Sequence, residues 1–295
     1  MTLDQLRIFL AVAEREHFTR AATALNLSQS AVSAAIATLE DRHAVRLFDR
    51  VGRRVVLTTA GRVFMAEARA VLKRAQQAEQ LLSDLAGLKQ GQLRLAASQT
   101  VASYWLPGVM VAFRTAYPGF DLHLTTGNSA QIIRLVREAE VDLGFVEGEA
   151  EDPALIVTQV PGDELALATA PGHHWAHTPP ETADDLRAGP WVIREEGSGT
   201  RAILEATLAA HGLRIQDVAV ALELPSNEAV KAAVEAGAGA TILSSLVLGA
   251  AFESGAAVRI PFDLAPRQFR ILQHRERRLS LAERRFLDLI SKMSG

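Results

Sequence analysis

Apolar residues three and four positions apart dominate the first sixty residues of the chain, which is the helical period. They predict an amphipathic helix beginning at Leu3, a short second helix from Phe18, and a third helix over residues 29–40. Asn26 falls in the tight turn before the third helix, where the backbone needs a residue that tolerates a left-handed conformation. Ser28 is a good N-cap for the helix that follows. The pattern therefore predicts a helix-turn-helix.

The third predicted helix has one apolar face and one polar face. The polar face opens with Gln29, Ser30 and Ser33, which are small donors and acceptors at the N-terminal end of the helix. This arrangement suits a recognition helix, whose first turns meet base edges and phosphates in the major groove of DNA. Leu27, just before it, is expected to be a buried anchor. The alternative is a helical hairpin within an ordinary α domain.

Two short apolar runs follow, at residues 45–48 and 55–58, and we expect both to be strands. The segment between them is basic and contains glycine, with Arg50, Arg53 and Arg54 as its cations. Two strands around such a loop form a wing, which places arginines against the phosphate backbone or in the minor groove. The sequence thus predicts a winged helix-turn-helix DNA-binding head over residues 1–58.

A long helix without proline is predicted from Thr59 to about Leu88. Its apolar positions step alternately by four and three residues, which is the heptad pattern of paired helices. This seam consists of Phe64, Ala68, Val71, Ala75, Ala78, Leu82 and Leu85. We expect residues 59–89 to form a linker helix that dimerises the chain. The alternative is a helix that packs on its own domain.

From residue 90 onward, strands alternate with helices, which implies parallel sheets covered by helices. Two alternating sets joined by crossings near residues 160–164 and 264–268 predict a two-lobed, periplasmic-binding-protein-like domain. Its expected boundaries are residues 90–295, with lobe I at 90–161 and 267–295 and lobe II at 162–266. The expected fold class is therefore α/β, with a winged helix-turn-helix head and a long linker helix.

Three motifs make the prediction for the head more specific: FxxAAxxLxxSQSAVSxxIxxLE from Phe18, RLFDR from Arg46, and LTxAG from Leu57. In these motifs and their spacing, the chain resembles the N-terminal domain of the LysR-type transcriptional regulators. One departure is at His43 and Ala44, where the family usually carries Leu-Gly. The missing glycine removes a residue suited to a left-handed helix end.

The resemblance implies a DNA-binding transcriptional regulator and not an enzyme. In the family, the long helix dimerises the chain, the bodies also pair, commonly into a homotetramer, and the two-lobed domain binds a small effector. The expected partners are double-stranded DNA, the effector, further copies of the chain, and RNA polymerase. The alternative is a regulator of the same fold that answers to a protein partner instead of a small ligand.

Four segments of the two-lobed domain place polar residues between a strand and a helix, at residues 98–100, 127–129, 196–201 and 226–228. Helix N-termini offer free amides and the positive end of the helix dipole, so they attract anions. For any single segment, simple N-capping is the alternative. The resemblance carries the family's effector-contacting positions to Ser98, Thr100, Asn128, Ser198, Thr200 and Asn227. Arg201 is expected to lend positive charge.

Residues 194–201, REEGSGTR, resemble the family's regulators of sulfur assimilation and of carbon fixation. Their effectors are small anions or phosphorylated metabolites, so we expect a sulfur oxyanion or a phosphorylated metabolite here. Glu147 ends a predicted buried strand near the same opening. Its carboxylate would either reject dianions or pair with Arg201.

Charge and composition agree with this picture. Residues 1–62 carry a net charge of +3 and residues 63–295 a net charge of −6, as expected when one end of a protein meets DNA. The chain has no cysteine, no signal-peptide pattern and no apolar run of membrane-spanning length. A cytoplasmic protein without a membrane partner is expected.

Enzyme and metal chemistry have little support in the sequence. The run GSG at residues 197–199 resembles part of a nucleophile elbow, but Glu196 stands where that motif needs its first glycine. Three histidines of residues 173–177 lie in a proline-rich loop with no carboxylate or cysteine at ligand spacing, so a solvated loop is preferred to a metal site. No catalytic residue, metal or cofactor is predicted.

Overall fold

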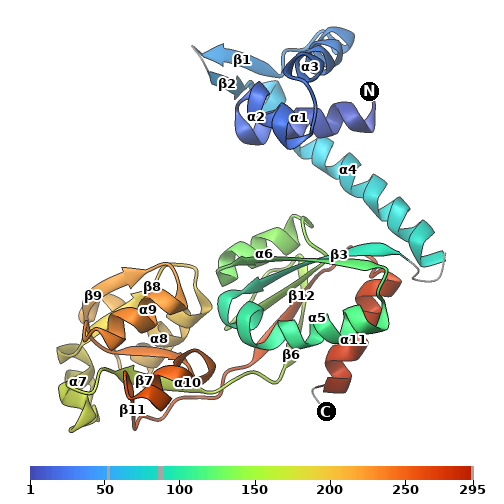
Figure 1. The fold of residues 1–295 in the computed structure, drawn as a ribbon. Coiled ribbons are helices and arrows are strands. Elements are labelled where there is room, and N and C mark those ends of the chain that lie inside the picture. Colours follow the sequence, from blue (N-terminus) through green and yellow to red (C-terminus); the bar gives the residue numbers. More distant parts are fainter. Residues whose placement is uncertain (52–53, 86–89, 294–295) are drawn as a thin grey trace. The chain divides into compact units, whose positions relative to one another are not determined.

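The computed structural model describes residues 1–51, 54–85 and 90–293. The chain divides into two compact units, the head (Met1–Leu85) and the body (Ala86–Gly295), coloured from blue to cyan and from cyan to red in Figure 1. The elements of the head are α1 (Leu3–Arg15), α2 (Phe18–Ala24), α3 (Gln29–His43), β1 (Phe48–Val51), β2 (Arg54–Leu57) and α4 (Thr59–Leu85).

The helix-turn-helix has the turn that the sequence predicts. Asn26 is left-handed, with φ of 53°, and the Ser28 side chain accepts a hydrogen bond from the backbone N–H of Ala31. The expectation for Leu27 is wrong, because its side chain is exposed. Half-buried Leu25 packs against the core of the head at this turn instead.

The wing begins later than predicted. The Glu40 carboxylate, at the end of α3, accepts hydrogen bonds from the backbone N–H groups of Leu47 at 2.6 Å and Phe48 at 3.1 Å. These bonds hold the chain before the strand, so β1 starts at Phe48 and not at residue 45. β1 pairs antiparallel with β2, with Val51 opposite Arg54. Arg50 and Arg54 are therefore strand residues, while Arg53 lies outside the described residues.

The residue that replaces the family's glycine keeps the glycine-like backbone. Ala44 ends α3 with φ of 51° and ψ of 37°, in the left-handed region. That conformation costs a residue with a Cβ roughly 1–2 kcal/mol. The gain on restoring glycine is smaller, because glycine loses more backbone entropy on folding.

We expect Ala44→Gly to stabilise the head by about 0.5–1 kcal/mol, since the gain is the left-handed strain minus the entropy term. Hydrogen exchange of the buried α3 amides would measure it. Ala37→Gly, an exposed interior position of the same helix, is the control and should lose about 1 kcal/mol. Equal destabilisation by both substitutions would contradict the strain at Ala44.

Helix α4 packs its first turns on the head. The Phe64 ring lies 4.9 Å from that of Phe9, and Ala68 is fully buried in the same core. These two residues of the predicted seam thus belong to the head's own core, which corrects that part of the prediction. Val71 and Leu82 are 40% and 67% exposed. The side chain of Leu85 lies outside the described residues, so the seam open to a second chain runs from Val71 to Leu82.

The helices and strands of the body have the following bounds. They are β3 (Gly91–Ser98), the π-helical turn η1 (Val101–Trp105), α5 (Leu106–Ala116), β4 (Phe120–Gly127), α6 (Ser129–Arg137), β5 (Leu143–Glu147), β6 (Leu155–Val160), β7 (Leu165–Thr169), η2 (His174–Ala176), α7 (Ala183–Ala188), β8 (Pro190–Arg194), α8 (Gly199–Ala210), η3 (Ile215–Asp217), β9 (Ala219–Leu224), α9 (Asn227–Glu235), β10 (Thr241–Ser244), α10 (Ser245–Ser254), β11 (Val258–Ile260), β12 (Phe269–His274) and α11 (Leu281–Met293).

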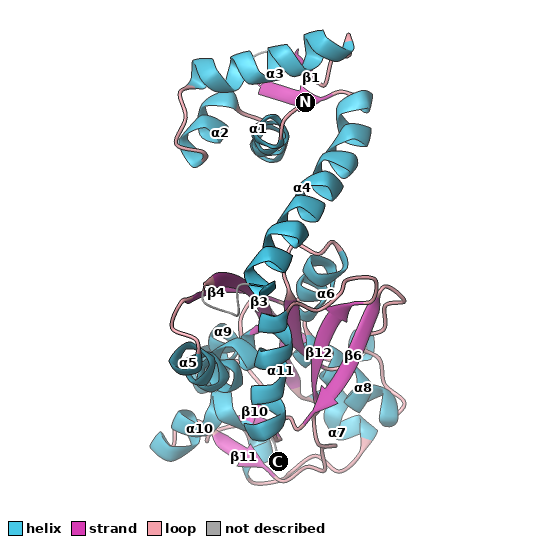
Figure 2. Ribbon diagram, turned by 90° about the vertical axis from the view of Figure 1, so that its right-hand side faces the viewer, coloured by secondary structure: helices cyan, strands magenta, loops and turns pink. Residues whose placement is uncertain are grey.

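Lobe I is built on a five-stranded sheet of order β4-β3-β5-β12-β6. Strand β3 is parallel to β4 and β5, as the alternation predicts, but β12 is antiparallel to both of its neighbours. Helices α5 and α11 cover one face of the sheet and α6 the other, and Figure 2 shows α11 running alongside β12. Because both faces are covered, every residue of β5 is buried.

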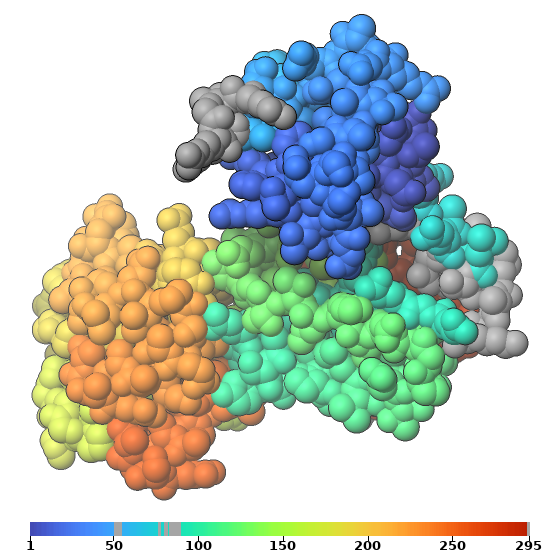
Figure 3. Space-filling view, turned by 45° about the horizontal axis from the view of Figure 1, so that its top comes forward, coloured from blue at the N-terminus to red at the C-terminus, as the bar shows by residue number. Residues whose placement is uncertain are grey.

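Lobe II holds an antiparallel sheet of order β10-β7-β11 and a parallel pair β8-β9, joined by a bridge between Trp191 and Ala240. The antiparallel sheet departs from the parallel arrangement that the sequence predicts. Helix α8 packs on one face, and α9 and α10 pack on the other. The sequence analysis does not predict the helices α7 and α10. The α10 sequence is mostly apolar, so no alternation of polar and apolar residues marks the helical period there. Figure 3 shows the surfaces of the two lobes meeting.

The two chain crossings between the lobes meet at a buried ion pair. Arg267 donates from Nε to Asp163 Oδ1 at 2.6 Å and from Nη2 to Oδ2 at 2.5 Å, and the Ser244 hydroxyl donates to the same carboxylate. The Arg267 and Asp163 side chains are 2% and 4% exposed. A Cβ at Gly162 would lie 1.9 Å from the Arg267 carbonyl oxygen, so the crossing requires glycine there.

Candidate functional site

The four polar segments predicted to bind a ligand come together between the lobes. Lobe I contributes the ends of β3, β4 and β5, and lobe II contributes the starts of α8 and α9. Five of the predicted residues are buried there: Ser98, Thr100, Ser198, Thr200 and Asn227. Asn128, which is half-buried, is the N-cap of α6 and forms a capping box with Gln131.

A buried carboxylate occupies the lobe I side of this cleft. Glu147 ends β5 and is 2% exposed. It accepts a hydrogen bond from the Ser98 hydroxyl, and its backbone oxygen accepts one from the Ser129 hydroxyl at 3.3 Å. Glu147 thus bonds to Ser98 and not to Arg201, which settles the pairing alternative left open by the sequence.

The start of α8 lies directly against this carboxylate. A Cβ built on Gly199 would be 2.4 Å from the Glu147 backbone oxygen and 2.7 Å from the Ser129 hydroxyl oxygen. Gly148, with φ of 81°, faces the same glycine. The two lobes therefore approach so closely here that only glycine fits at position 199.

The first turn of α8 has polar groups without protein partners. Ser198 is its N-cap residue but makes no side-chain capping bond, and Thr200 follows two residues later. Thr200 is 3% exposed, and its hydroxyl has no hydrogen-bond partner within the described part of the chain. A buried hydroxyl without a partner is unfavourable unless a ligand or water bonds to it. The N-terminal amides and dipole of α8 favour a negatively charged ligand at this position.

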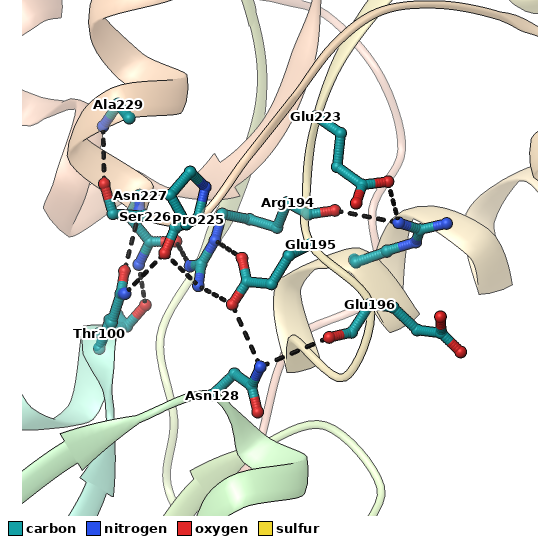
Figure 4. Close-up of polar contacts among 12 residues, drawn as sticks. Thr100, Asn128, Arg194, Glu195, Glu196, Glu223, Pro225, Ser226, Asn227 and Ala229 are labelled. Carbon is teal, nitrogen blue, oxygen red and sulfur yellow. Dashed lines mark hydrogen bonds and ion pairs between the residues drawn. The ribbon is translucent and has the colours of Figure 1, made fainter. Parts of the chain in front are cut away.

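A chain of hydrogen bonds crosses the cleft from lobe I to lobe II and back (Figure 4). The Asn227 amide donates from Nδ2 to Thr100 Oγ1 at 3.0 Å and accepts from Arg194 Nη1 through Oδ1. Arg194 also donates to the Glu195 carboxylate, at 2.7 Å from Nε and 2.9 Å from Nη2. Glu195 accepts in turn from Asn128 Nδ2 at 3.3 Å.

The ionisation of Glu195 reflects this network. Partial burial opposes the charged form, but the hydrogen bonds and charge of Arg194, with the Asn128 amide, outweigh it and hold the pKa below its usual range. A carboxyl group whose pKa is lower in the folded than in the unfolded protein stabilises the fold at any pH above its unfolded-state pKa. That stability is lost as the pH falls through its folded-state pKa. Glu195 is therefore ionised at neutral pH, as an acceptor for both Arg194 and Asn128.

Arg201 does not join the other predicted residues. Its guanidinium bonds to Glu205 at 2.8 Å, to Glu223 at 2.6 Å and to the Arg194 backbone oxygen at 3.3 Å. Both carboxylates balance its charge, so we leave Arg201 out of the candidate site. The buried cation of the cleft is Arg194, which the sequence reasoning did not select. A charged residue that ends the buried strand Pro190–Arg194 was the available signal.

The DNA-facing residues predicted from the sequence lie at the start of α3. Gln29 and Ser30 are exposed, Ser33 is half-buried, and Gln29 Nε2 donates to Ser33 Oγ at 3.2 Å. The side chains of Arg50 and Arg54 lie outside the described residues, as does all of Arg53. The three polar residues thus share one exposed helix end, which is the surface that a major groove would meet.

Within the described ranges, the histidine and carboxylate side chains do not form a group of three that could hold a metal ion. Nor is any helix in those ranges long and apolar enough to span a membrane.

Both the head and the body match families of known proteins. Residues 3–62 match the family described as "Bacterial regulatory helix-turn-helix protein, lysR family", and residues 86–294 match "LysR substrate binding domain". The chain is 38% identical over 290 residues to the "Uncharacterized HTH-type transcriptional regulator YeiE" of Escherichia coli strain K12, covering 98% of this chain and 96% of that protein.

Solved structures agree. Full-length CbnR complexed with its target DNA has a TM-score of 0.71 at 23% identity, covering 99% of both chains, and thus shares the fold. The regulatory domain of CcmR from Synechocystis PCC6803, in complex with 2-PG, has a TM-score of 0.63 at 28% identity, covering 70% of this chain and 98% of that one. With both domain families matched along nearly its whole length, the chain belongs to the LysR family of DNA-binding transcriptional regulators.

Proposed function

We propose that this LysR-type regulator responds to a small anion held between its lobes by Ser98, Thr100, Asn128, Ser198, Thr200 and Asn227. The observation that carries the proposal is the Thr200 hydroxyl, which is buried at the start of α8 and has no partner among the described residues. The Ser98 hydroxyl donates to Glu147, but the hydroxyls of Ser198 and Thr200 and the amides of the helix N-termini supply donors that suit the oxygens of an anion.

The ligand class that we propose is a sulfur oxyanion or a phosphorylated metabolite. A regulatory domain of the same fold, that of CcmR, forms a complex with 2-PG, which supports a small ligand of this domain. Glu147 limits the charge that the ligand can carry, because a buried carboxylate disfavours a second negative charge beside it. Ligands with one negative charge and a proton to donate, such as hydrogen sulfite or dihydrogen phosphate, should therefore bind more tightly than a dianion such as sulfate.

We further propose an assembly in which two chains pair along the open seam of α4, from Val71 to Leu82. Two heads would then meet a two-fold DNA site, with Gln29, Ser30 and Ser33 at base edges. Arg50, Arg53 and Arg54 would meet the phosphates. Pairing of the bodies would give a homotetramer that acts in the cytoplasm with RNA polymerase. The relatives are transcriptional regulators, and we assign no catalytic role to Ser198.

The anion should stabilise the folded body. At a hundred times its dissociation constant it should add about 2.7 kcal/mol to the free energy of unfolding. A panel of sulfur oxyanions, phosphorylated sugars, carboxylates and aromatic acids would be tested on the full chain by thermal unfolding. Tryptophan fluorescence reports on the body alone, because Trp105, Trp175 and Trp191 all lie there.

Thr100→Val and Ser198→Ala should each reduce the thermal stabilisation that the anion gives. Ser254→Ala is the control: it deletes a hydroxyl at the exposed end of α10 and should leave that stabilisation unchanged. Stabilisation confined to aromatic acids would show that the ligand class is wrong. An anion effect that survives both cleft substitutions would place the ligand elsewhere. A body that no small molecule stabilises would favour control by a protein partner.

A further inference from the structure

Arg194 is a buried cation whose guanidinium donates hydrogen bonds to Asn227, Glu195 and the Pro225 backbone oxygen. Its side chain is 2% exposed. Nη1 donates to Asn227, while Nε and Nη2 donate to Glu195, so the guanidinium is fixed from two sides. The Glu195 carboxylate balances its charge, which removes most of the attraction that it would offer to an anion. Its position therefore suggests that it orients a neighbour.

The chemistry of the guanidinium fixes the orientation of the Asn227 amide. Arginine has five N–H donors and no acceptor, so the Asn227 atom that faces it must be the carbonyl oxygen. The NH2 group of Asn227 must then face Thr100, where it donates to Oγ1 at 3.0 Å. Asn227 is 4% exposed, so water does not offer its amide an alternative orientation.

The direction of these bonds determines what the Thr100 hydroxyl can do. Because Oγ1 accepts from Asn227, the hydroxyl proton must point elsewhere. No acceptor for this proton is found among the described residues, and Thr100 is 1% exposed. The proton is therefore available to a ligand in the cleft.

We propose that Arg194 is a positioning residue for effector recognition, which acts through the Asn227 amide to make the Thr100 hydroxyl a hydrogen-bond donor to the anion. This inference rests on the proposed anion site, but it assigns a role to a residue that makes no contact with the ligand. It also explains how the site would select among ligands, since a fixed N–H or O–H donor binds a ligand oxygen and disfavours a ligand N–H group at the same position.

We call the path from Arg194 through the Asn227 amide to the Thr100 hydroxyl the relay. The substitution Asn227→Asp tests it with the least disturbance to the fold. The new carboxylate keeps the oxygen that faces Arg194 but turns the group that faces Thr100 from a donor into an acceptor. Thr100 must then donate to this carboxylate and loses its proton for the ligand. We expect thermal stability at or above that of the wild type, together with about tenfold weaker binding of sulfite, sulfate or inorganic phosphate by titration calorimetry on the full chain.

Two comparisons separate the relay from the charge that Asn227→Asp adds. Gln99→Glu places one negative charge beside Asn227 and leaves the Asn227 side-chain amide intact, since Gln99 bonds only to the backbone of this segment, accepting from Asn227 N and donating to the Pro225 oxygen. The Pro225 oxygen keeps the donor Arg194 Nη2 after the substitution. In a Thr100→Val background, Asn227→Asp should cost less affinity than in the wild type, because only the direct contact of Asn227 remains to be lost, whereas Thr100→Ser should bind like the wild type. An equal loss with Gln99→Glu, or a loss that adds fully to that of Thr100→Val, would overturn the relay.

Neutron diffraction from crystals of the deuterated protein tests the relay without any ligand. The Asn227 deuterons should point to Thr100 and the Thr100 deuteron into the cleft. A Thr100 deuteron directed at Asn227 would overturn the relay whether or not an anion binds. If the wild type binds none of the three anions while the deuterons lie as expected, the anion proposal alone fails.

Discussion

Replacing Asp163 with alanine is expected to lower the free energy of unfolding of the body by about 3–5 kcal/mol. The substitution removes the carboxylate that balances Arg267 and leaves a guanidinium that is only 2% exposed without its ion partner. It also removes the acceptor of the Ser244 hydroxyl. Urea unfolding followed by tryptophan fluorescence would measure the loss in the body alone.

The matched control is Asp184→Ala, in the same lobe. Asp184 also pairs with an arginine, Arg187, but the two side chains are 87% and 51% exposed. Exposed pairs add little to stability, so the urea midpoint should stay close to that of the wild type. Similar midpoints for the two variants would mean that the buried pair does not secure the crossing.

Charges placed in the open part of the α4 seam are expected to separate the proposed dimer. Ala75→Glu with Ala78→Glu puts carboxylates where two helices would pack closely. A single head then binds DNA without a second head tethered to it, and affinity should fall by about a hundredfold or more. Sedimentation velocity and a DNA titration at fixed salt would measure the two effects.

Ala66→Glu with Ala70→Glu provides the same change of charge on the same helix. Both residues are exposed and lie outside the heptad seam, so dimerisation should persist. DNA affinity should then fall only slightly, through charge repulsion. A seam variant that remains at the wild-type size and binds DNA as tightly would assign dimerisation to another surface.

The sequence predicts an element well where the element's own residues determine it. The turn at Asn26 and the cap at Ser28 depend on local backbone chemistry, and both are present. The start of the wing depends on the Glu40 side chain, seven residues before the first amide that it binds, so strand pattern alone misplaced it. The seam fails at Phe64 for a similar reason, because a heptad does not reveal which partner covers it.

The candidate site follows the same rule. A sequence shows where a helix begins directly after a strand. That pattern identified Thr200 and Asn227 without knowledge of their contacts. The sequence could not distinguish Arg194 from Arg201, which stand seven residues apart in one segment. Their roles are set by tertiary contacts: Asn227 and Glu195 hold the Arg194 side chain, whereas Glu205 and Glu223 hold that of Arg201.

The strand order of lobe I also governs the order in which the body folds. Strand β12 lies between β5 and β6, and β6 pairs with no other strand of the described sheet. Yet β12 leaves the ribosome only after the whole of lobe II. Lobe II can therefore complete its sheets during synthesis, while lobe I waits for its missing strand with β6 unpaired. A chain truncated after residue 266, which lacks β12, should have a protease-resistant lobe II and a lobe I that is open to cleavage.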